Sequence, residues 1–388
     1  MRDSHHEMFG VVLQRRLPAR SLLDDLRTVI VTAGAPVWGQ EKERVMDFDI
    51  MVGPSRWSDA AELAVTAESA GFSGLMFTET GQTPWMSIAA AAMAAPSLTY
   101  STGIAVAFPM SPMVAASLAW ELADNTQGQF RLGLGSQVRA HIERRYGMEF
   151  DPPGPRMRDY LHAVQATLAA FRGDAKLDHR GPYYELTMLP QQWMPLSHDH
   201  GDVKVDVSAV GPWMTRMAGA VADGVHVHPL HSVHYINERL LPAVAEGAAS
   251  ADRDPSEVDL LIPAFIVPGD TPEEREALAY RARTQIGFYG STKNYAFQFD
   301  DLGFEGVSSR LNDCIKAGDM NGLAATITDE MLDTFAIVGP WAEIADRLID
   351  RYQGLAERVI SYLTVDDVAA NPDNVSKWRD VATAVTAA

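Results

Sequence analysis

Glu79 is the acidic side chain that the sequence places where chemistry could occur. It follows the apolar run "GLMF" (74–77) after a single intervening Thr, in the stretch "GLMFTETGQTPW". A carboxylate at the end of a buried strand often meets a ligand, although it can instead pair with an arginine of a neighbouring strand. His141, in the segment "VRAHIERRYG" (138–147), is a second side chain suited to proton transfer. We take Glu79 and His141 as the candidate catalytic residues.

The segment around His141 concentrates positive charge in an acidic protein. A glycine-rich stretch, "GLGSQ" (133–137), leads into Arg139, Arg144 and Arg145. Local positive charge against a negative background indicates an anionic ligand nearby. A solvated helix face with ordinary ion pairs explains the same residues, and both interpretations stay open.

A third candidate is the junction inside "VDVSAVGPWMTRMAGAVADG" (205–224), which passes from an alternating strand pattern to an amphipathic helix. Val210 and Gly211 can turn their backbone N–H groups outward, and Pro212 suits the first position of a helix. The free donors at a helix N-terminus suit a phosphate. A plain strand-to-helix turn is the simpler interpretation of a lone Gly-Pro pair.

Four histidines, at 226, 228, 231 and 234, raise the question of a metal site. They lack a matching Asp, Glu or His cluster of known ligand spacing, so we predict that the chain holds no metal ion. The sequence also lacks a Ser-His-Asp order, a P-loop and a G-x-G-x-x-G motif at a helix start. Hydrolase, kinase and dinucleotide-binding folds are therefore not supported.

Short runs rich in Val, Ile and Phe alternate with stretches of helical period after residue 45. Strands are predicted at 46–52, 74–79, 98–108, 130–135, 203–210, 224–228, 260–267 and 358–364. Helices are predicted between them, including one capped by Ser58 that stops at Gly71, and others over 111–128, 155–173 and 340–354.

Eight strands separated by helices predict an α/β fold, a (β/α)8 TIM barrel, with an open doubly wound sheet as the alternative. The long stretches 174–202 and 270–335 are predicted insertions after strands four and seven. In such a barrel the active site lies at the carboxyl ends of the strands, which is where the candidate residues fall.

The predicted barrel domain covers 46–388, and residues 1–45 do not share its pattern. This first segment is either a poorly ordered extension or an artefact of gene-start assignment, with Met46 as the true start. The chain of 388 residues carries 32 Lys and Arg against 51 Asp and Glu, a formal charge of -19. That charge disfavours nucleic acid and anionic membranes as partners. A single cysteine, Cys314, and the lack of a membrane-spanning run predict a cytoplasmic protein.

Taken together, four segments resemble the luciferase-like monooxygenase superfamily, in particular its oxidoreductases that depend on the deazaflavin coenzyme F420. The segments are "AAELAVTAESAGFSGLMFTETGQTPW", "LTYSTGIAVAFPMSPMVAASLAWELADNTQGQFRLGLGSQVRAHIERRYG", "GPYYEL" and "SAVGPWMTRMAGAVADGVHVHP". The resemblance implies a luciferase-like barrel with a cofactor lying across its strand ends. It also favours a homodimer.

The resemblance further implies positions for the cofactor. A non-proline cis peptide behind the cofactor ring would match Gly103 and Ile104, and a phosphate grip would match Val210, Gly211 and Pro212. The remaining cofactor contacts implied by the resemblance are Glu79, Ser136, Gln137 and Ser232. Thr80 stands where the sugar-phosphate dehydrogenase branch has a catalytic histidine, which argues against that chemistry.

Three functions follow as hypotheses. The first is hydride transfer between F420 and a small organic substrate, with Trp85, Phe108, Met110, Tyr146 and Trp193 as candidates for an apolar substrate wall. The second keeps the fold but uses reduced FMN and oxygen, as a two-component monooxygenase does. The third is a barrel that binds a flavin or deazaflavin without catalysis.

Overall fold

The computed structural model describes residues 45–388, whose centre is a closed barrel of parallel strands. Strand β10 pairs with both β9 and β12, and this double pairing closes the ring. The predicted barrel is therefore confirmed, and the open-sheet alternative is wrong. In ring order the strands are β1 (Asp47–Val52), β2 (Gly74–Phe77), β3 (Thr99–Thr102) with its continuation β4 (Ala105–Val106), β5 (Phe130–Gly135), β8 (Lys204–Ser208), β9 (Gly224–His226), β10 (Asp259–Pro268) and β12 (Arg358–Ser361).

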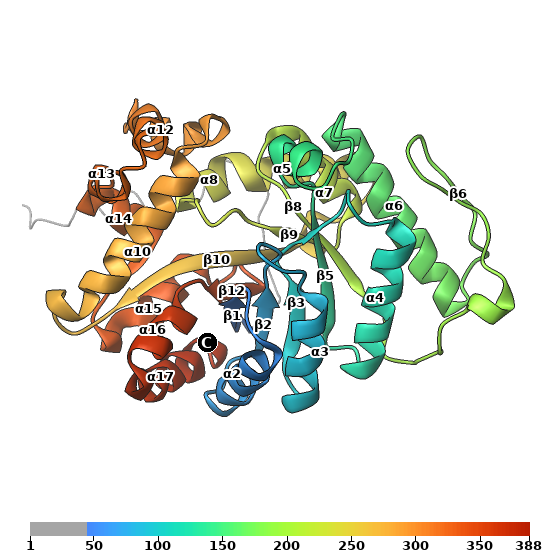
Figure 1. The fold of residues 1–388 in the computed structure, drawn as a ribbon, viewed down its shortest axis with the longest axis horizontal. Helices are drawn as coiled ribbons and strands as arrows, with labels where there is room; N and C mark the ends of the chain where they lie inside the picture. The colour runs from blue at the N-terminus through green and yellow to red at the C-terminus, as the bar shows by residue number, and fades with distance from the viewer. Residues whose placement is uncertain (1–44) are drawn as a thin grey trace, which may run out of the picture. The chain divides into compact units, whose positions relative to one another are not determined.

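Helices surround these strands (Figure 1). In α15 the buried side chains are Ile344, Leu348 and Tyr352, spaced four residues apart along one face. The helices around the strands are α2 (Trp57–Ser69), α3 (Trp85–Ala94), α4 (Pro112–Asn125), α5 (Arg139–Arg144), α6 (Pro153–Arg172), α7 (Pro212–Val221), α8 (Val233–Tyr235), the π-helix η3 (Ile236–Leu240), α9 (Leu241–Ser250), α15 (Trp341–Tyr352), α16 (Thr364–Ala370) and α17 (Val375–Thr386), with single turns η4 (Pro255–Glu257) and η6 (Pro372–Asn374).

Of two helix ends predicted from residue types, the end of α6 is as expected and the start of α2 differs. Gly173 ends α6 with φ of +88°, a backbone conformation that residues other than glycine rarely adopt. Ser58 was predicted to cap α2, but Arg56 holds the cap position and the Ser58 hydroxyl donates to Asp59 inside the first turn. Across the described residues no helix is both long and apolar enough to cross a membrane.

The insertion after β5 and α6 is a small hairpin of β6 (His179–Arg180) and β7 (Glu185–Leu186), followed by the turn η2 (Gln191–Trp193). Asp159 of α6 anchors this hairpin. Its carboxylate accepts hydrogen bonds from the N–H groups of Tyr183 and Tyr184, at 2.8 and 2.9 Å. The hairpin is thus fixed to the outside of the barrel.

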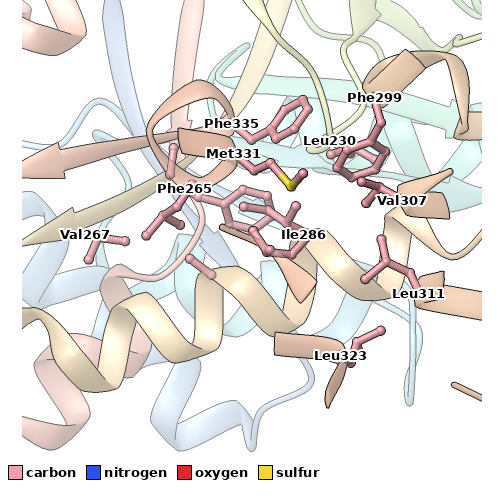
Figure 2. Packing of buried hydrophobic residues seen from close by; sticks show 14 of the residues in the cluster. Leu230, Phe265, Val267, Ile286, Phe299, Val307, Leu311, Leu323, Met331 and Phe335 are labelled. Carbon is pink, nitrogen blue, oxygen red and sulfur yellow. The ribbon is translucent and has the colours of Figure 1, made fainter. Parts of the chain in front are cut away.

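The insertion after β10 is helical and has its own apolar core. It comprises α10 (Pro272–Gly290), η5 (Lys293–Tyr295), α11 (Phe297–Asp300), α12 (Val307–Ala317), α13 (Met320–Thr326), α14 (Asp329–Phe335) and the short strand β11 (Ala336–Gly339). Figure 2 shows Phe335 and Met331 beside Phe265 of β10, and Phe299 beside Leu230 and Val307 of the same cluster. The end of α10 is therefore held firmly beside the strands β9, β10 and β12.

The amino ends of the barrel strands carry a buried ionic network that the sequence patterns did not predict. Arg131 of β5 bonds to Asp206 of β8 at 2.8 Å and to Asp259 of β10 at 3.0 Å. Arg358 of β12 bonds to Asp49 of β1 at 2.7 Å. Both arginines are at most 9% exposed, so this end of the barrel is closed by paired charges.

Candidate functional site

At the opposite end, Glu79 lies just beyond β2 and joins two neighbouring elements. One carboxylate oxygen accepts a hydrogen bond from the backbone N–H of Val106 in β4 at 2.8 Å, and the other accepts from the Tyr146 hydroxyl at 3.3 Å. Burial raises the pKa of Glu79 above its usual range. Glu79 is still half-exposed, so this protonatable group borders the barrel mouth.

The peptide bond between Gly103 and Ile104 is cis, as the resemblance implied. Two close approaches hold it. A Cβ atom on Gly103 would lie 2.2 Å from the sulfur of Met76, and one on Gly135 would lie 2.7 Å from Cδ1 of Ile104. Glycine at 103 therefore suits the packing against Met76 of β2, and glycine at 135 suits the packing of β5 against Ile104.

Ser136 and Gln137 follow β5 and are half-buried. Gln137 has φ of +57°, and its side-chain oxygen accepts a hydrogen bond from the N–H of Val138 at 2.9 Å. The Ser136 hydroxyl donates to the Gln137 carbonyl at 3.3 Å. Both side chains thus shape the turn into α5, and the structure itself does not test their predicted contact with a cofactor.

The turn after β8 leaves the start of α7 open. Gly211 is the cap residue, Pro212 is the first helical residue, and no side chain caps the helix. A Cβ on Gly211 would meet no atom within 4 Å. The first N–H groups of α7 therefore face open space beside a residue whose missing side chain leaves room for a ligand.

Ser232 and Val210 are connected through a single tyrosine. Ser232 is buried and caps α8, accepting a hydrogen bond from the N–H of Tyr235 at 3.1 Å. The Tyr235 hydroxyl in turn donates to the carbonyl of Val210 at 3.1 Å. Two residues that the resemblance assigns to phosphate contact are thereby held on neighbouring elements.

His141 does not join this group through its side chain. It is exposed on α5, whereas two other residues of the same segment lie at the site: Tyr146 contacts Glu79, and Arg145 contacts Thr80. The Arg145 guanidinium donates to the carbonyl of Thr80. Tyr146 was predicted only as substrate wall, and its bond to Glu79 had no sequence signal because the two residues belong to different loops.

Two arginines of the basic segment 138–147 differ in their surroundings, which bears on whether the segment is a solvated helix face or borders a ligand. Arg139 forms exposed ion pairs with Glu143 at 2.9 Å and with Asp151 at 2.5 Å, as a solvated helix face would. Arg145, by contrast, lies over the ring of Tyr146 at 5.0 Å, beside the candidate site.

The four histidines do not form a metal centre. His231 is buried, and its two ring nitrogens lie 2.9 Å from the His228 carbonyl and 3.1 Å from the Tyr352 hydroxyl. Within residues 45–388 no three His, Cys, Asp or Glu side chains are grouped so that they could hold an ion. His226 is the last residue of β9, and the other three histidines follow this strand.

The family model described as luciferase-like monooxygenase matches residues 31–358. The chain belongs to this family. A luciferase-like relative, an uncharacterized protein of Mycobacterium tuberculosis, is 34% identical over 307 residues, which cover 79% of this chain and 90% of the relative. Family membership accounts for the barrel.

Two solved structures share this luciferase-like fold. The coenzyme F420 dependent tetrahydromethanopterin reductase from Methanopyrus kandleri has a TM-score of 0.70 and 17% identity, with coverage of 87% of this chain and 97% of that one. A type II Baeyer-Villiger monooxygenase of Pseudomonas putida, in complex with FMN, has a TM-score of 0.60 and 16% identity, with coverage of 87% and 98%. The fold therefore accommodates both deazaflavin and flavin enzymes.

Proposed function

We propose that this luciferase-like protein is an oxidoreductase that transfers a hydride between coenzyme F420 and a small organic substrate. The observation that carries the proposal is the uncapped start of α7 at Gly211, which lies at the carboxyl end of a barrel strand. Free N–H donors and the positive end of the helix dipole suit the phosphate of such a cofactor.

The residues around this turn fit a phosphate. Gly211 has φ of -77°, an ordinary value, so glycine is not needed there for backbone reasons. A bound group would therefore occupy the space where a Cβ atom of residue 211 would lie. It would be held by the backbone of Val210 and Gly211 and by the first turn of α7. Ser232, through Tyr235, would support that grip.

Glu79, Ser136 and Gln137 complete the cofactor side of the mouth in this proposal, and Gly103 and Ile104 would lie behind the ring. The cofactor supplies the hydride chemistry when bound. The protein's residues then position the reactants and exclude water, and Glu79, whose pKa burial raises, can hold a proton beside the ring. His141 is exposed and could act only at the rim.

Of the proposed substrate wall, Trp85 and Phe108 are buried, and Phe108 packs edge-on against Phe150 at 6.2 Å. Trp193 differs, because it is 72% exposed and lies on η2 of the hairpin insertion. The wall is better assigned to Phe108, Met110 and Tyr146 than to Trp193.

Titration of the purified protein with F420 and with FMN, each followed by fluorescence, tests the proposal. We expect tight binding of F420 and oxidation of reduced F420 by a substrate panel. Submicromolar FMN binding without F420 binding would support the two-component monooxygenase instead. Tight F420 binding without turnover of any substrate would support the non-catalytic barrel.

We also propose that the protein acts in the cytoplasm as a homodimer, with a small molecule as its substrate. The single Cys314 suits a reducing compartment. Sedimentation of the purified protein measures the oligomeric state, and a monomer at micromolar concentration would contradict the dimer.

A further inference from the structure

A second polar cluster follows strands β9 and β12, beside helix α10. We propose that His228, Tyr289 and Tyr362 form a neutral donor site that binds the oxygen of an uncharged carbonyl substrate and supplies its proton. The inference rests on the proposed function, since it assigns the substrate class to the same mouth. It also assigns a role to the insertion after β10, from which Tyr289 comes.

The two tyrosines are directly bonded. Tyr289, at the end of α10, and Tyr362, just beyond β12, have hydroxyl oxygens 2.7 Å apart. The Tyr289 oxygen also accepts a hydrogen bond from the side chain of Gln285. One hydroxyl of the tyrosine pair donates to the other, so one of the two phenolic protons remains outside the pair. Burial raises the pKa of both tyrosines, which keeps both phenols protonated at neutral pH.

His228 adds a second donor. Its Nδ1 accepts a hydrogen bond from the N–H of Leu230 at 3.1 Å, and burial lowers the pKa of the ring to about 4. The neutral ring therefore carries its proton on Nε2, for which no partner occurs among the described residues. The ring packs against Tyr289 and Tyr295, with centroids 4.8 and 4.4 Å apart.

The cluster lies close to the proposed ring position. Tyr362 packs on a small apolar group formed by Met51, Met76, Leu261 and Ile360. Met76 in turn fills the space in front of Gly103. Tyr362 and the Gly103–Ile104 peptide therefore border the same apolar group.

The local charges favour an uncharged substrate. Asp366, whose negative charge raises the pKa of Tyr362, pairs with Arg281 at 2.6 Å. His228, Tyr289 and Tyr362 carry no charge at neutral pH. The donor site therefore offers hydrogen-bond donors but no charged group that could pair with an ionic substrate. Binding a carboxylate or an ammonium group here would leave its charge poorly compensated.

The step is balanced with the reductant of the proposed function. A hydride from the reduced deazaflavin adds to the carbonyl carbon, the C=O π bond breaks, and the oxygen takes the free phenolic proton to give an alcohol. The resulting phenolate regains a proton from solvent through the partner hydroxyl. No further oxidant or reductant is required.

The test uses the full chain loaded with oxidised F420 and the probe para-dimethylaminocinnamaldehyde, whose absorption moves to longer wavelength when its carbonyl accepts a hydrogen bond. We expect a red shift in the wild type, and little binding of the matched carboxylate, para-dimethylaminocinnamate. Tyr289→Phe with Tyr362→Phe should weaken aldehyde binding about three- to tenfold and reduce the shift. Tyr280→Phe, on the same helix but bonded to Asn321, should leave both unchanged.

The inference is overturned if the double variant keeps the wild-type shift, if the carboxylate binds as tightly as the aldehyde, or if loaded protein binds no aldehyde. F420 binding is measured in every sample and separates the two proposals. If the double variant keeps both F420 binding and the wild-type red shift, only the donor site is contradicted. If the wild type does not bind F420, the proposed function is contradicted. Aldehyde binding by cofactor-free protein then still tests the donors.

Discussion

The two ends of the barrel use polar side chains in opposite ways. At the amino ends of the strands, Arg131 and Arg358 are buried and each contacts two carboxylates. At the carboxyl ends, Glu79 is half-exposed, α7 begins without a cap and His228 has a donor without a partner. Polar groups that satisfy one another stabilise a fold, whereas groups with spare hydrogen-bonding capacity are available to a ligand.

The largest effect is expected from breaking the closed end. Arg131→Met removes the bidentate partner of Asp206, and leaving this buried charge uncompensated costs about 3 to 5 kcal/mol. Urea unfolding measures the loss. Arg139→Met is the matched control, because Arg139 also contacts two carboxylates but is exposed, and it should cost less than about 1 kcal/mol. Equal losses would mean that burial does not distinguish the two arginines.

A smaller effect on stability is expected at His231. This residue follows β9 near the mouth, but both of its ring nitrogens have partners, as the charged groups of the closed end do. Burial lowers its pKa from 6.5 to about 4. Between these values the unfolded chain binds a proton that the folded chain does not, so stability falls as pH drops from 6.5 toward 4. His231 should account for about 2 kcal/mol of this fall between pH 6.5 and 5. His231→Gln should reduce the proton uptake on unfolding by about one, and an unchanged uptake would contradict this packing account.

The smallest change in stability is expected at Glu79. Because its pKa is raised in the fold, its ionised form is disfavoured there, and the stability it contributes below its unfolded pKa is lost as pH rises through the folded value. Glu79→Gln should therefore leave the thermal midpoint at pH 8 equal or slightly higher, while substrate turnover falls. A clear loss of stability would place Glu79 with the structural groups of the closed end instead.

Much of the fold could be predicted because the strand and helix periods alternate cleanly after residue 45, and each of the eight predicted strands overlaps an observed one. The boundary at 45 stays a prediction, since residues 1–44 lie outside the described part. Barrel closure could not be derived from local pattern, because the pairing of β10 with β9 and β12 depends on contacts between distant segments.

The candidate site was only partly predictable for the same reason. Glu79 and Gly211 fall at strand ends, which the sequence locates well. Gly103 lay inside the predicted strand 98–108, which the structure divides into β3 and β4, and only the resemblance singled it out. The bond between Tyr146 and Glu79 joins residues 67 positions apart, and no periodicity records it. The ionic network was missed because a charged residue inside a strand, such as Arg131, suggests a solvent-facing position unless the barrel interior is known.

The most direct test of the contrast between the two ends is substitution at Gly211, read by F420 titration and thermal unfolding together. Gly211→Asp would cap α7 and place a negative charge in the open space, whereas Gly211→Ala adds only a methyl group that meets no atom within 4 Å. We predict that Gly211→Asp weakens F420 binding about tenfold or more with an equal or higher melting temperature, and that Gly211→Ala, whose methyl group enters the same space without a charge, weakens binding less. Wild-type F420 affinity in a folded Gly211→Asp protein would contradict the account.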